Sequence, residues 1–475
     1  MHDAAQALAA FSFSLAPVGM AQGESRRVAA GKGSSYSCSR RITDEQAQWI
    51  APHPREDHVA SPLLHPPLFR QRNFSALWWG QLVSLVGERL TYLALIGLLA
   101  QHTHAFKDAR SSLLLSLLAN VMLVPVLLFA PFAGAWVDRR NLQRVMVGAD
   151  LLRAGIVLAV PLLYRVTHAM PPVFVLLFML FTCGVFFLPA KSALTPEIVA
   201  APQLLAANTW LSAAGIAATA VGSLGGGWLV DHWGWSLALY LNAATYLVSV
   251  AAVLSIRHTP PEHHASAHGP LLSGYLRQVR EGLAAVRANP RVGLALTTLA
   301  AVWLAGGFLH VAGNLQIQRA AGTPSVSRLG VLMAVLGVGS ALSAWWLNSR
   351  GRNLQRPPVL VGGLALAGAG LLVFAATDLF AMFVFAAFLM GLAAAPALMV
   401  TETLLQEATE PGLRGRVFGT RDFLMRSVLL LSVSAAGWVT RQLGPAPALL
   451  LAGALVMGVS ALTFARFRVV VRTLR

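Results

Sequence analysis

Charged residues are scarce in this 475-residue chain and make up only 12% of it, against about 25% in an ordinary soluble domain. Lysine is nearly absent, with three residues in all, and 19 acidic residues stand against 36 basic ones. Hydrophobic residues account for 56% of the chain. So little charge beside so many apolar residues excludes a typical soluble domain and indicates a membrane protein.

Cysteine is also rare, and the sequence motifs of common enzymes are missing. The two cysteines, Cys38 and Cys183, give neither a disulfide framework nor a metal cluster. The chain has no phosphate-binding Gly-x4-Gly-Lys-Ser/Thr loop, no His-Glu-x-x-His and no Gly-x-Ser-x-Gly. We therefore expect no enzyme, no cofactor and no metal, and we expect an ion gradient rather than ATP as the energy source.

Long apolar runs are what the chain has instead. Runs of about 20 residues, the length that crosses a hydrocarbon core of about 30 Å, recur twelve times after an N-terminal region of 66 residues. The predicted spans are residues 74–100, 113–137, 145–163, 173–188, 207–230, 235–256, 292–315, 329–347, 358–376, 379–399, 423–439 and 446–465. This pattern predicts an all-α membrane protein with twelve transmembrane helices.

The charge distribution predicts how these helices are oriented. Twelve spans place both termini on one side, and if that side is the cytoplasm, twenty-one basic residues lie inside and six outside. Such an excess follows the positive-inside rule. We therefore attribute the net charge of +17 to topology and expect no nucleic-acid partner. Residues 1–66 lack sustained periodicity and should form a disordered cytoplasmic tail.

An internal duplication divides the rest of the chain. The sequence Asn-Leu-Gln-Arg at residues 141–144, after the second span, recurs at 353–356, after the eighth. Two related six-helix units are typical of secondary transporters. We predict an N-terminal six-helix bundle at 67–257, a cytoplasmic linker with an amphipathic helix at 258–291, and a C-terminal six-helix bundle at 292–475.

The loop after the second span carries a recognisable pattern, Gly134-Ala-Trp-Val-Asp-Arg-Arg-Asn-Leu-Gln-Arg144. Gly134 permits close helix contact, and the carboxylate of Asp138 suits a neighbouring helix N-terminus. Arg139 and Arg144 suit the anionic cytoplasmic leaflet. The loop resembles the major facilitator signature Gly-x3-Asp-Arg-x4-Arg. That resemblance implies the major facilitator fold and a latch that joins the cytoplasmic ends of the two halves in the outward-facing state.

The start of the eleventh span offers partners for this latch. Arg421 and Arg426 lie there, beside Asp422 at the helix N-terminus. Either arginine could hold the carboxylate of Asp138. The loop after the eighth span has Asn348 where a second copy of the signature would carry aspartate, so only the first copy is expected to latch.

Three further segments narrow the resemblance to one branch of the family. They are Asn73-Phe-x4-Trp79-Gly-Gln-Leu-Val-Ser84-x2-Gly87-Glu88, Pro189-Ala-Lys-Ser-Ala-Leu-Thr-Pro196-Glu197-Ile-Val and Arg414-Gly-Arg416-Val-Phe-Gly419. They are similar to segments of Tap-type multidrug, macrolide and enterobactin exporters, which are drug:proton antiporters. The chain departs from that branch at Glu88, where the family usually has aspartate, and at Arg89, which places an opposite charge beside it.

Glu88 and Arg89 are the candidates for proton coupling. A charge near the middle of a span costs a few kcal/mol on insertion scales and marks function by default, and burial disfavours the ionised carboxylate. Gly80, Ser84 and Gly87 on the same face should leave Glu88 room to face a cavity. The other interpretation is a structural ion pair of Glu88 with Arg89 or Arg153.

Other polar groups at membrane depth are candidates for the substrate cavity, although such groups more often join helices by hydrogen bonds. They are Gln81, Ser84, Asn120, Asn242, Tyr246, His310 and Asn314. Asp150 and Arg153, three residues apart on the third span, suit a local structural pair. In the linker, residues 272–288 carry apolar residues at helical spacing between arginines, which predicts an amphipathic helix on the membrane surface.

The resemblance implies a secondary active efflux transporter that exports amphipathic small molecules, multidrug or siderophore-like, by proton antiport and alternating access. We expect a monomer in the cell inner membrane, in contact with membrane lipids. Segments 127–134 and 189–191 also resemble lysophospholipid flippases, so a lipid transporter is the alternative. A non-transporting receptor or scaffold on the same fold is a rival from another class.

Overall fold

A computed structural model describes residues 66–106, 108, 110–257, 280, 284, 290–322, 325–350, 356–409 and 414–473 of the chain. The described residues from 67 onward belong to one compact unit. The predicted tail, apart from Pro66, lies outside the described residues. So does the predicted amphipathic helix of the linker, apart from Arg280 and Ala284.

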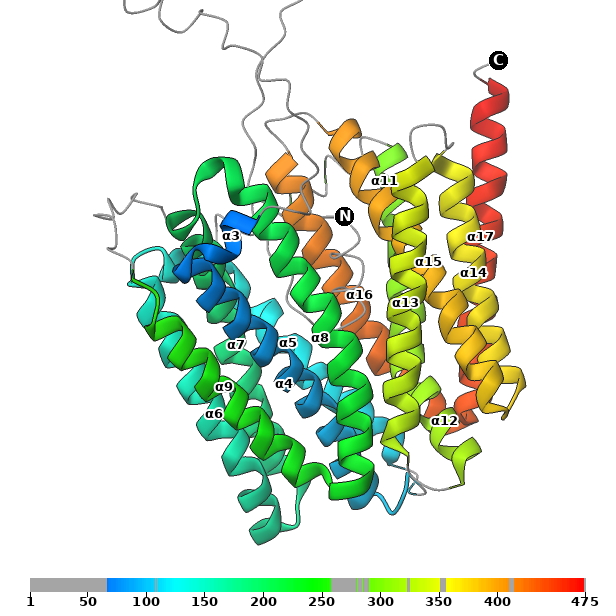
Figure 1. The fold of residues 1–475 in the computed structure, drawn as a ribbon. Coiled ribbons are helices and arrows are strands. Elements are labelled where there is room, and N and C mark those ends of the chain that lie inside the picture. The colour runs from blue at the N-terminus through cyan, green and yellow to red at the C-terminus, as the bar shows by residue number, and fades with distance from the viewer. Residues whose placement is uncertain are drawn as a thin grey trace, which may run out of the picture. The chain divides into compact units, whose positions relative to one another are not determined.

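The described residues form helices only, and twelve of these are long and apolar enough to cross a membrane, as predicted (Figure 1). A short helix, α3 (Pro66–Arg70), precedes them. The first six are α4 (Arg72–His102), α5 (Ser111–Val137), α6 (Leu142–Thr167), α7 (Met170–Ile198), α8 (Leu204–Trp233) and α9 (Trp235–Leu254), with a 3₁₀ turn, η1 (Ala201–Gln203), before α8.

The second six spans are helical throughout, with one irregular turn. They are α11 (Pro290–Phe308) continued by η2 (Leu309–Gly313) and α12 (Asn314–Ala321), then α13 (Val326–Arg350), α14 (Arg356–Ala376), α15 (Phe380–Ala408), α16 (Arg414–Leu443) and α17 (Pro445–Thr473). The η2 segment is a π-helical turn, which the apolar pattern did not predict.

Several helices are longer than the apolar runs that predicted them. α7 continues to Ile198, ten residues past the predicted end, and α16 begins at Arg414, nine residues before the predicted start. A helix needs apolar side chains only where it crosses hydrocarbon, whereas its backbone hydrogen bonds continue into the polar interface. Hydropathy therefore locates the spans well and their ends poorly.

Local sequence explains several turns, and two of them repeat between the halves. The side chain of Asn141 accepts a hydrogen bond from the backbone N–H of Arg144 at 2.9 Å and so caps α6. Gly234 joins α8 to α9 with φ of +85°, and Gly444 joins α16 to α17 with φ of +90°. A positive φ favours glycine because it has no Cβ. The two glycines occupy corresponding positions, which agrees with an internal duplication.

The two halves meet mainly through α8 with α13 and through α5 with α16. The contacts concentrate at one end of the bundle, where α8 and α16 end and α5 and α13 begin; we call this the paired end. Figure 1 shows α8 and α13 converging toward it. There, a Cβ added to Gly437 of α16 would lie 2.9 Å from the hydroxyl of Ser116 in α5. Such close backbone contact requires glycine.

Candidate functional site

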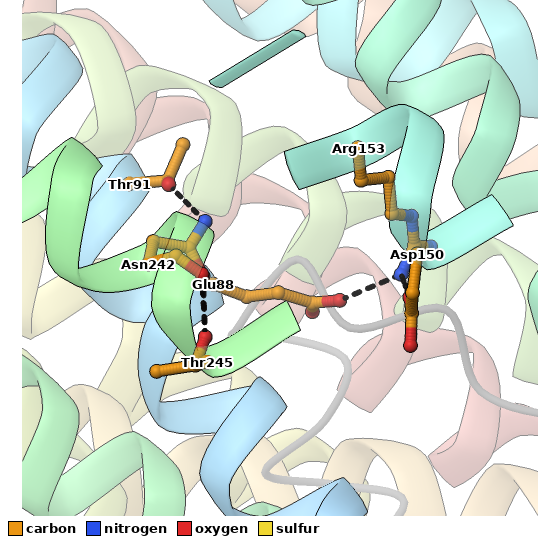
Figure 2. A network of polar contacts seen from close by, with 6 residues as sticks. All are labelled: Glu88, Thr91, Asp150, Arg153, Asn242 and Thr245. Atoms are coloured by element: carbon orange, nitrogen blue, oxygen red, sulfur yellow. Dashed lines mark hydrogen bonds and ion pairs between the residues drawn. The ribbon is translucent and has the colours of Figure 1, made fainter. Parts of the chain in front are cut away.

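Three charged side chains from two helices meet within the N-terminal half. An ion pair joins Glu88 of α4 to Arg153 of α6 at 3.5 Å, and Arg153 donates a hydrogen bond to Asp150 at 3.2 Å. Figure 2 shows the Glu88 side chain extended away from Asn242 and toward Arg153. The sequence left a proton carrier and a structural ion pair open for Glu88, and the contact that forms is with Arg153 of another helix.

The two carboxylates differ in how firmly they are held. The side chain of Asp150 is fully buried, whereas that of Glu88 is 32% exposed. The guanidinium of Arg153 is also stacked over the rings of Phe187 and Tyr246, at 5.0 and 5.5 Å from their centres. Arg153 is thus fixed by Asp150 and two aromatic rings, and Glu88 is its more distant and more accessible partner.

A pocket surrounds Glu88 and carries both apolar and charged walls. Its polar and charged lining comes from Gln81, Ser84, Glu88, Arg89, Thr91, Tyr92, Arg153, Lys191 and Tyr246. Its apolar lining comes from Leu85, Met122, Leu180, Phe181, Phe187 and Leu188, with Gly184. Of the predicted cavity residues, Gln81, Ser84 and Tyr246 line this pocket. A mixed wall of this kind suits an amphipathic ligand.

The role of Gly80 and Gly87 in α4 differs from the prediction. We expected Gly80 and Gly87 to leave space for Glu88. Instead both face α9: a Cβ at Gly80 would stand 2.7 Å from the Cβ of Ala252, and one at Gly87 would overlap the side chains of Asn242 and Thr245. The glycines therefore let α4 pack closely against α9, while Glu88 projects from a different face of α4.

Asn242 serves to join helices. Its amide donates to the hydroxyl of Thr91 in α4 at 2.5 Å, and its carbonyl oxygen accepts from Thr245 at 2.9 Å. The side chain is completely buried. These bonds satisfy the amide inside the bundle, so the structure supports a helix-to-helix role over a substrate contact.

Two other predicted cavity residues join the two halves of the protein. Asn120 of α5 donates to the hydroxyl of Ser434 in α16 at 2.9 Å. His310 of the π-helical turn lies 3.2 Å from the hydroxyl of Tyr92 in α4. Asn314, which follows that turn, is 2% exposed, and its amide has no hydrogen-bond partner in the part of the chain that the structure describes.

The predicted latch is not formed in this structure. Asp138 ends α5 as an exposed residue. Arg421 instead bonds to Glu402 of α15 and, at 2.8 Å, to Asp422. Arg139 and Arg144 are exposed, and a Cβ at Gly134 would meet no described atom within 4 Å.

The latch was predicted only for a state in which the ends that carry Asp138 and Arg421 are joined. Here the halves meet at the opposite, paired end. The latch, with Arg421 or Arg426 as its partner, therefore stays a prediction for the other state.

Sequence reasoning missed two residues. Asp231, at the end of α8, accepts from the backbone N–H groups of Val326 and Ser327 at 2.8 and 2.9 Å, and so holds the start of α13 across the halves. Lys191 of α7 lines the pocket beside Glu88. The rarity of lysine was a signal for Lys191, whereas Asp231 lies just past the end of the predicted span 207–230, where a single acid gave none.

Comparison with known proteins identifies the family. The model of the Major Facilitator Superfamily matches residues 77–354. The chain belongs to this superfamily. The transporter is 25% identical over 402 residues to Macrolide efflux protein A of Streptococcus pyogenes, covering 81% of this chain and 93% of that protein. It is 26% identical to the uncharacterized MFS-type transporter YfiS of Bacillus subtilis, covering 84% and 94%.

Solved structures agree with the fold. The crystal structure of nucleoside transporter NupG matches this major facilitator protein with a TM-score of 0.61 and 14% identity, covering 83% of this chain and 99% of that one. At this identity the likeness concerns the fold alone. The prediction of a major facilitator fold with twelve transmembrane helices is confirmed.

Proposed function

We propose that this transporter exports amphipathic small molecules from the cytoplasm in exchange for protons, with both termini in the cytoplasm of a bacterial cell and the bundle in the inner membrane. The observation that carries the proposal is the loose pairing of Glu88 inside a pocket of mixed polarity. The likeness to a macrolide efflux protein supports export. The excess of basic residues on the side of the termini supports the orientation.

Glu88 can change its protonation without stranding its partner. When Glu88 takes up a proton, Arg153 loses a partner 3.5 Å away but keeps Asp150 at 3.2 Å. An unpaired charge at membrane depth is costly, and Asp150 prevents that cost. The partial exposure of Glu88 gives the proton a route from the pocket. A proton and a cationic group of the substrate would then compete for one carboxylate, which is the requirement for exchange.

The conformation suits the loading step of export. The halves are joined at the paired end, through Asp231 with α13 and through Asn120 with Ser434. In the proposed orientation this is the outer end. The substrate would therefore enter from the cytoplasm, and alternating access would follow when the paired end separates and the latch of Asp138 forms.

The driving force is adequate for a single proton per cycle. One charge moving through 100 mV yields about 2.3 kcal/mol. Because about 1.4 kcal/mol corresponds to a tenfold ratio, that energy supports a gradient of about 50-fold for a solute without net charge. A concentration gradient of this size can be maintained without ATP hydrolysis.

Transport by purified protein in liposomes tests the proposal. With a proton gradient imposed, the wild-type protein should move a fluorescent amphipathic dye against its gradient. Glu88→Gln should abolish uphill movement while keeping downhill exchange, with weaker dye binding because a cationic group loses its carboxylate partner, and Glu88→Asp should retain most uphill activity. Asp378→Asn is the matched control. Asp378 lies in the C-terminal half, outside the pocket, and accepts a hydrogen bond from Gln316 of the same half at 2.9 Å.

The outcomes separate the alternatives. Uphill accumulation by Glu88→Gln would exclude the proton-carrier role and leave Glu88 as a structural ion pair with Arg153. A wild-type protein that binds the dye yet moves none in either direction would support a receptor or scaffold instead of a transporter.

A further inference from the structure

The pocket around Glu88 holds more positive than negative charge. Arg89, Arg153 and Lys191 line it, and Glu88 is the acid among its lining residues. Asp150, fully buried behind Arg153, supplies a second negative charge. Three cations thus stand against two anions within the described part of this site.

Arg89 and Lys191 are the cations of this pocket that form no ion pair with a described residue, because Arg153 is paired with both acids. The Nε of Arg89 is buried without a hydrogen-bond partner, in a residue that is 7% exposed. In the described part of the chain, no carboxylate lies within 4 Å of either Arg89 or Lys191. A poorly paired cation at membrane depth is costly and marks function by default.

The position of Arg89 is enforced by its neighbours. A Cβ at Gly222 of α8 would stand 2.8 Å from the Cβ of Arg89 and 3.0 Å from its Cγ. The glycine is what allows the arginine stem to pass along α8. The stem of Arg89 is therefore held between α4 and α8, in a residue that is buried.

From this arrangement we infer that the substrate is an amphipathic zwitterion: its acidic group binds Lys191, its amine binds Glu88, and its apolar part packs against Phe181 and Met122. The acid would supply the ion-pair partner that Lys191 lacks among the described residues. This inference rests on the proposed function, because it assigns the amine as the group that competes with the proton for Glu88.

An acid alone would not give exchange. An anion bound beside Glu88 would repel the carboxylate and favour its protonation, so that proton and anion would travel together. An amine stabilises the ionised carboxylate and expels the proton. A ligand with both groups can bind the cations and still compete with the proton, provided that the amine reaches Glu88.

Three forms of one dipeptide test the charge requirement. Phenylalanyl-phenylalanine is a zwitterion with aromatic side chains, its C-terminal amide is a cation, and its N-acetyl form is an anion. Binding to the purified transporter is measured by calorimetry. We expect the zwitterion to bind about 10- to 100-fold more tightly than the amide, the range of one charge-assisted hydrogen bond.

Two variants of Lys191 test whether this residue causes the tighter binding of the zwitterion. In Lys191→Met the zwitterion should lose its advantage over the amide. The amide should bind at least as tightly as to the wild type, because a cation beside Glu88 has been removed, and this binding shows that the protein is folded. Lys191→Arg should keep the advantage. Equal binding of zwitterion and amide by the wild type, or an advantage that survives Lys191→Met, would overturn the inference.

A lysophospholipid with an ethanolamine headgroup carries the same pair of charges, with phosphate as its acid. A second titration with this lipid separates the two sources of acid. A Lys191-dependent advantage of the dipeptide over its amide assigns a carboxylate, and lipid binding that is lost in Lys191→Met and restored in Lys191→Arg assigns a phosphate. The inference fails if neither ligand depends on Lys191.

Transport in liposomes distinguishes failure of this inference from failure of the proposed function. If protons drive export of the amide as fast as export of the zwitterion, the proposed function is supported and the inference of a zwitterionic substrate is wrong. If the dipeptide binds in a Lys191-dependent manner but protons drive the movement of none of its forms, the zwitterion site is supported and proton-coupled export is wrong.

Discussion

Closure of the paired end depends on Gly227, and replacing it by alanine should open that end. A Cβ at Gly227 of α8 would stand 2.8 Å from both the Cα of Ser327 and the carbonyl oxygen of Val326 in α13. Carbon atoms prefer about 3.5–4.0 Å, so the α13 backbone would have to retreat by about 1 Å. That retreat also pulls on the hydrogen bonds from Val326 and Ser327 to Asp231.

The size of the effect follows from the clash alone. Overpacking by one methyl group costs about 1–3 kcal/mol. The gain in helix propensity from glycine to alanine, about 0.5–1 kcal/mol, is the same whether the end is paired or separated, so it does not shift the balance. Because about 1.4 kcal/mol is a tenfold ratio, we expect the separated population to rise by about 5- to 150-fold.

Distances between spin labels measure this balance. The labels are attached to cysteines placed at Val166, in the last turn of α6, and at Leu379, which precedes α15. Both side chains are well exposed, at 74% and 66%. The two native cysteines are first replaced by serine. Gly227→Ala should move the distance distribution toward longer separations.

Gly225→Ala, two residues earlier on the same helix, is the matched control. A Cβ there meets no described atom within 4 Å, so it should leave the distribution unchanged. If Gly227→Ala gives the same distribution as Gly225→Ala, glycine contact does not hold the paired end together and the reasoning fails.

Three further predictions concern other parts of the chain. Removal of residues 2–64 should leave membrane insertion and dye export intact, as measured in whole cells, since this region lacks apolar periodicity; loss of either would contradict that view. Asp138→Asn should weaken the latch and make cysteine cross-links between the ends that carry Asp138 and Arg421 about 2- to 5-fold rarer under turnover, the effect of one carboxylate at a helix terminus, and an unchanged yield would count against the latch. Asp231→Asn should also shift the spin-label distribution toward longer separations, but the separated population should rise by only about 2- to 5-fold, because Asp231 is exposed. Asp378→Asn should leave the distribution unchanged.

The sequence was sufficient for the spans and for the family, because both depend on patterns that survive without knowledge of contacts. Twelve apolar runs gave twelve helices, and the loop from Gly134 to Arg144 indicated the superfamily that the family model matches. The π-helical turn at Leu309–Gly313 was not predictable in the same way. It adds one residue to a helical turn without changing hydropathy.

The candidate site was predicted only in part. Glu88 stood out because it is an acid inside an apolar run, and its neighbour Arg153 was among the predicted partners. The neighbour that each face of a helix contacts was harder to predict. Gly80 and Gly87 share a helix with Glu88 but face α9. Which face of a helix meets lipid, pocket or partner helix is set by packing among all twelve, and a hydropathy pattern does not contain it.

The arrangement of Asp150, Arg153 and Glu88 explains why two acids serve one arginine. With Asp150 alone, Arg153 would be neutralised and the pocket would hold no group whose charge can change at little cost. With Glu88 alone, each protonation would leave an unpaired arginine at membrane depth. Together, the buried Asp150 fixes Arg153, and the partly exposed Glu88, at 3.5 Å, is the more loosely held acid, as the proposed exchange of a proton for a ligand amine requires. In the proposed function, this pairing of a structural acid with an exchangeable one would let a single carboxylate couple proton entry to substrate export.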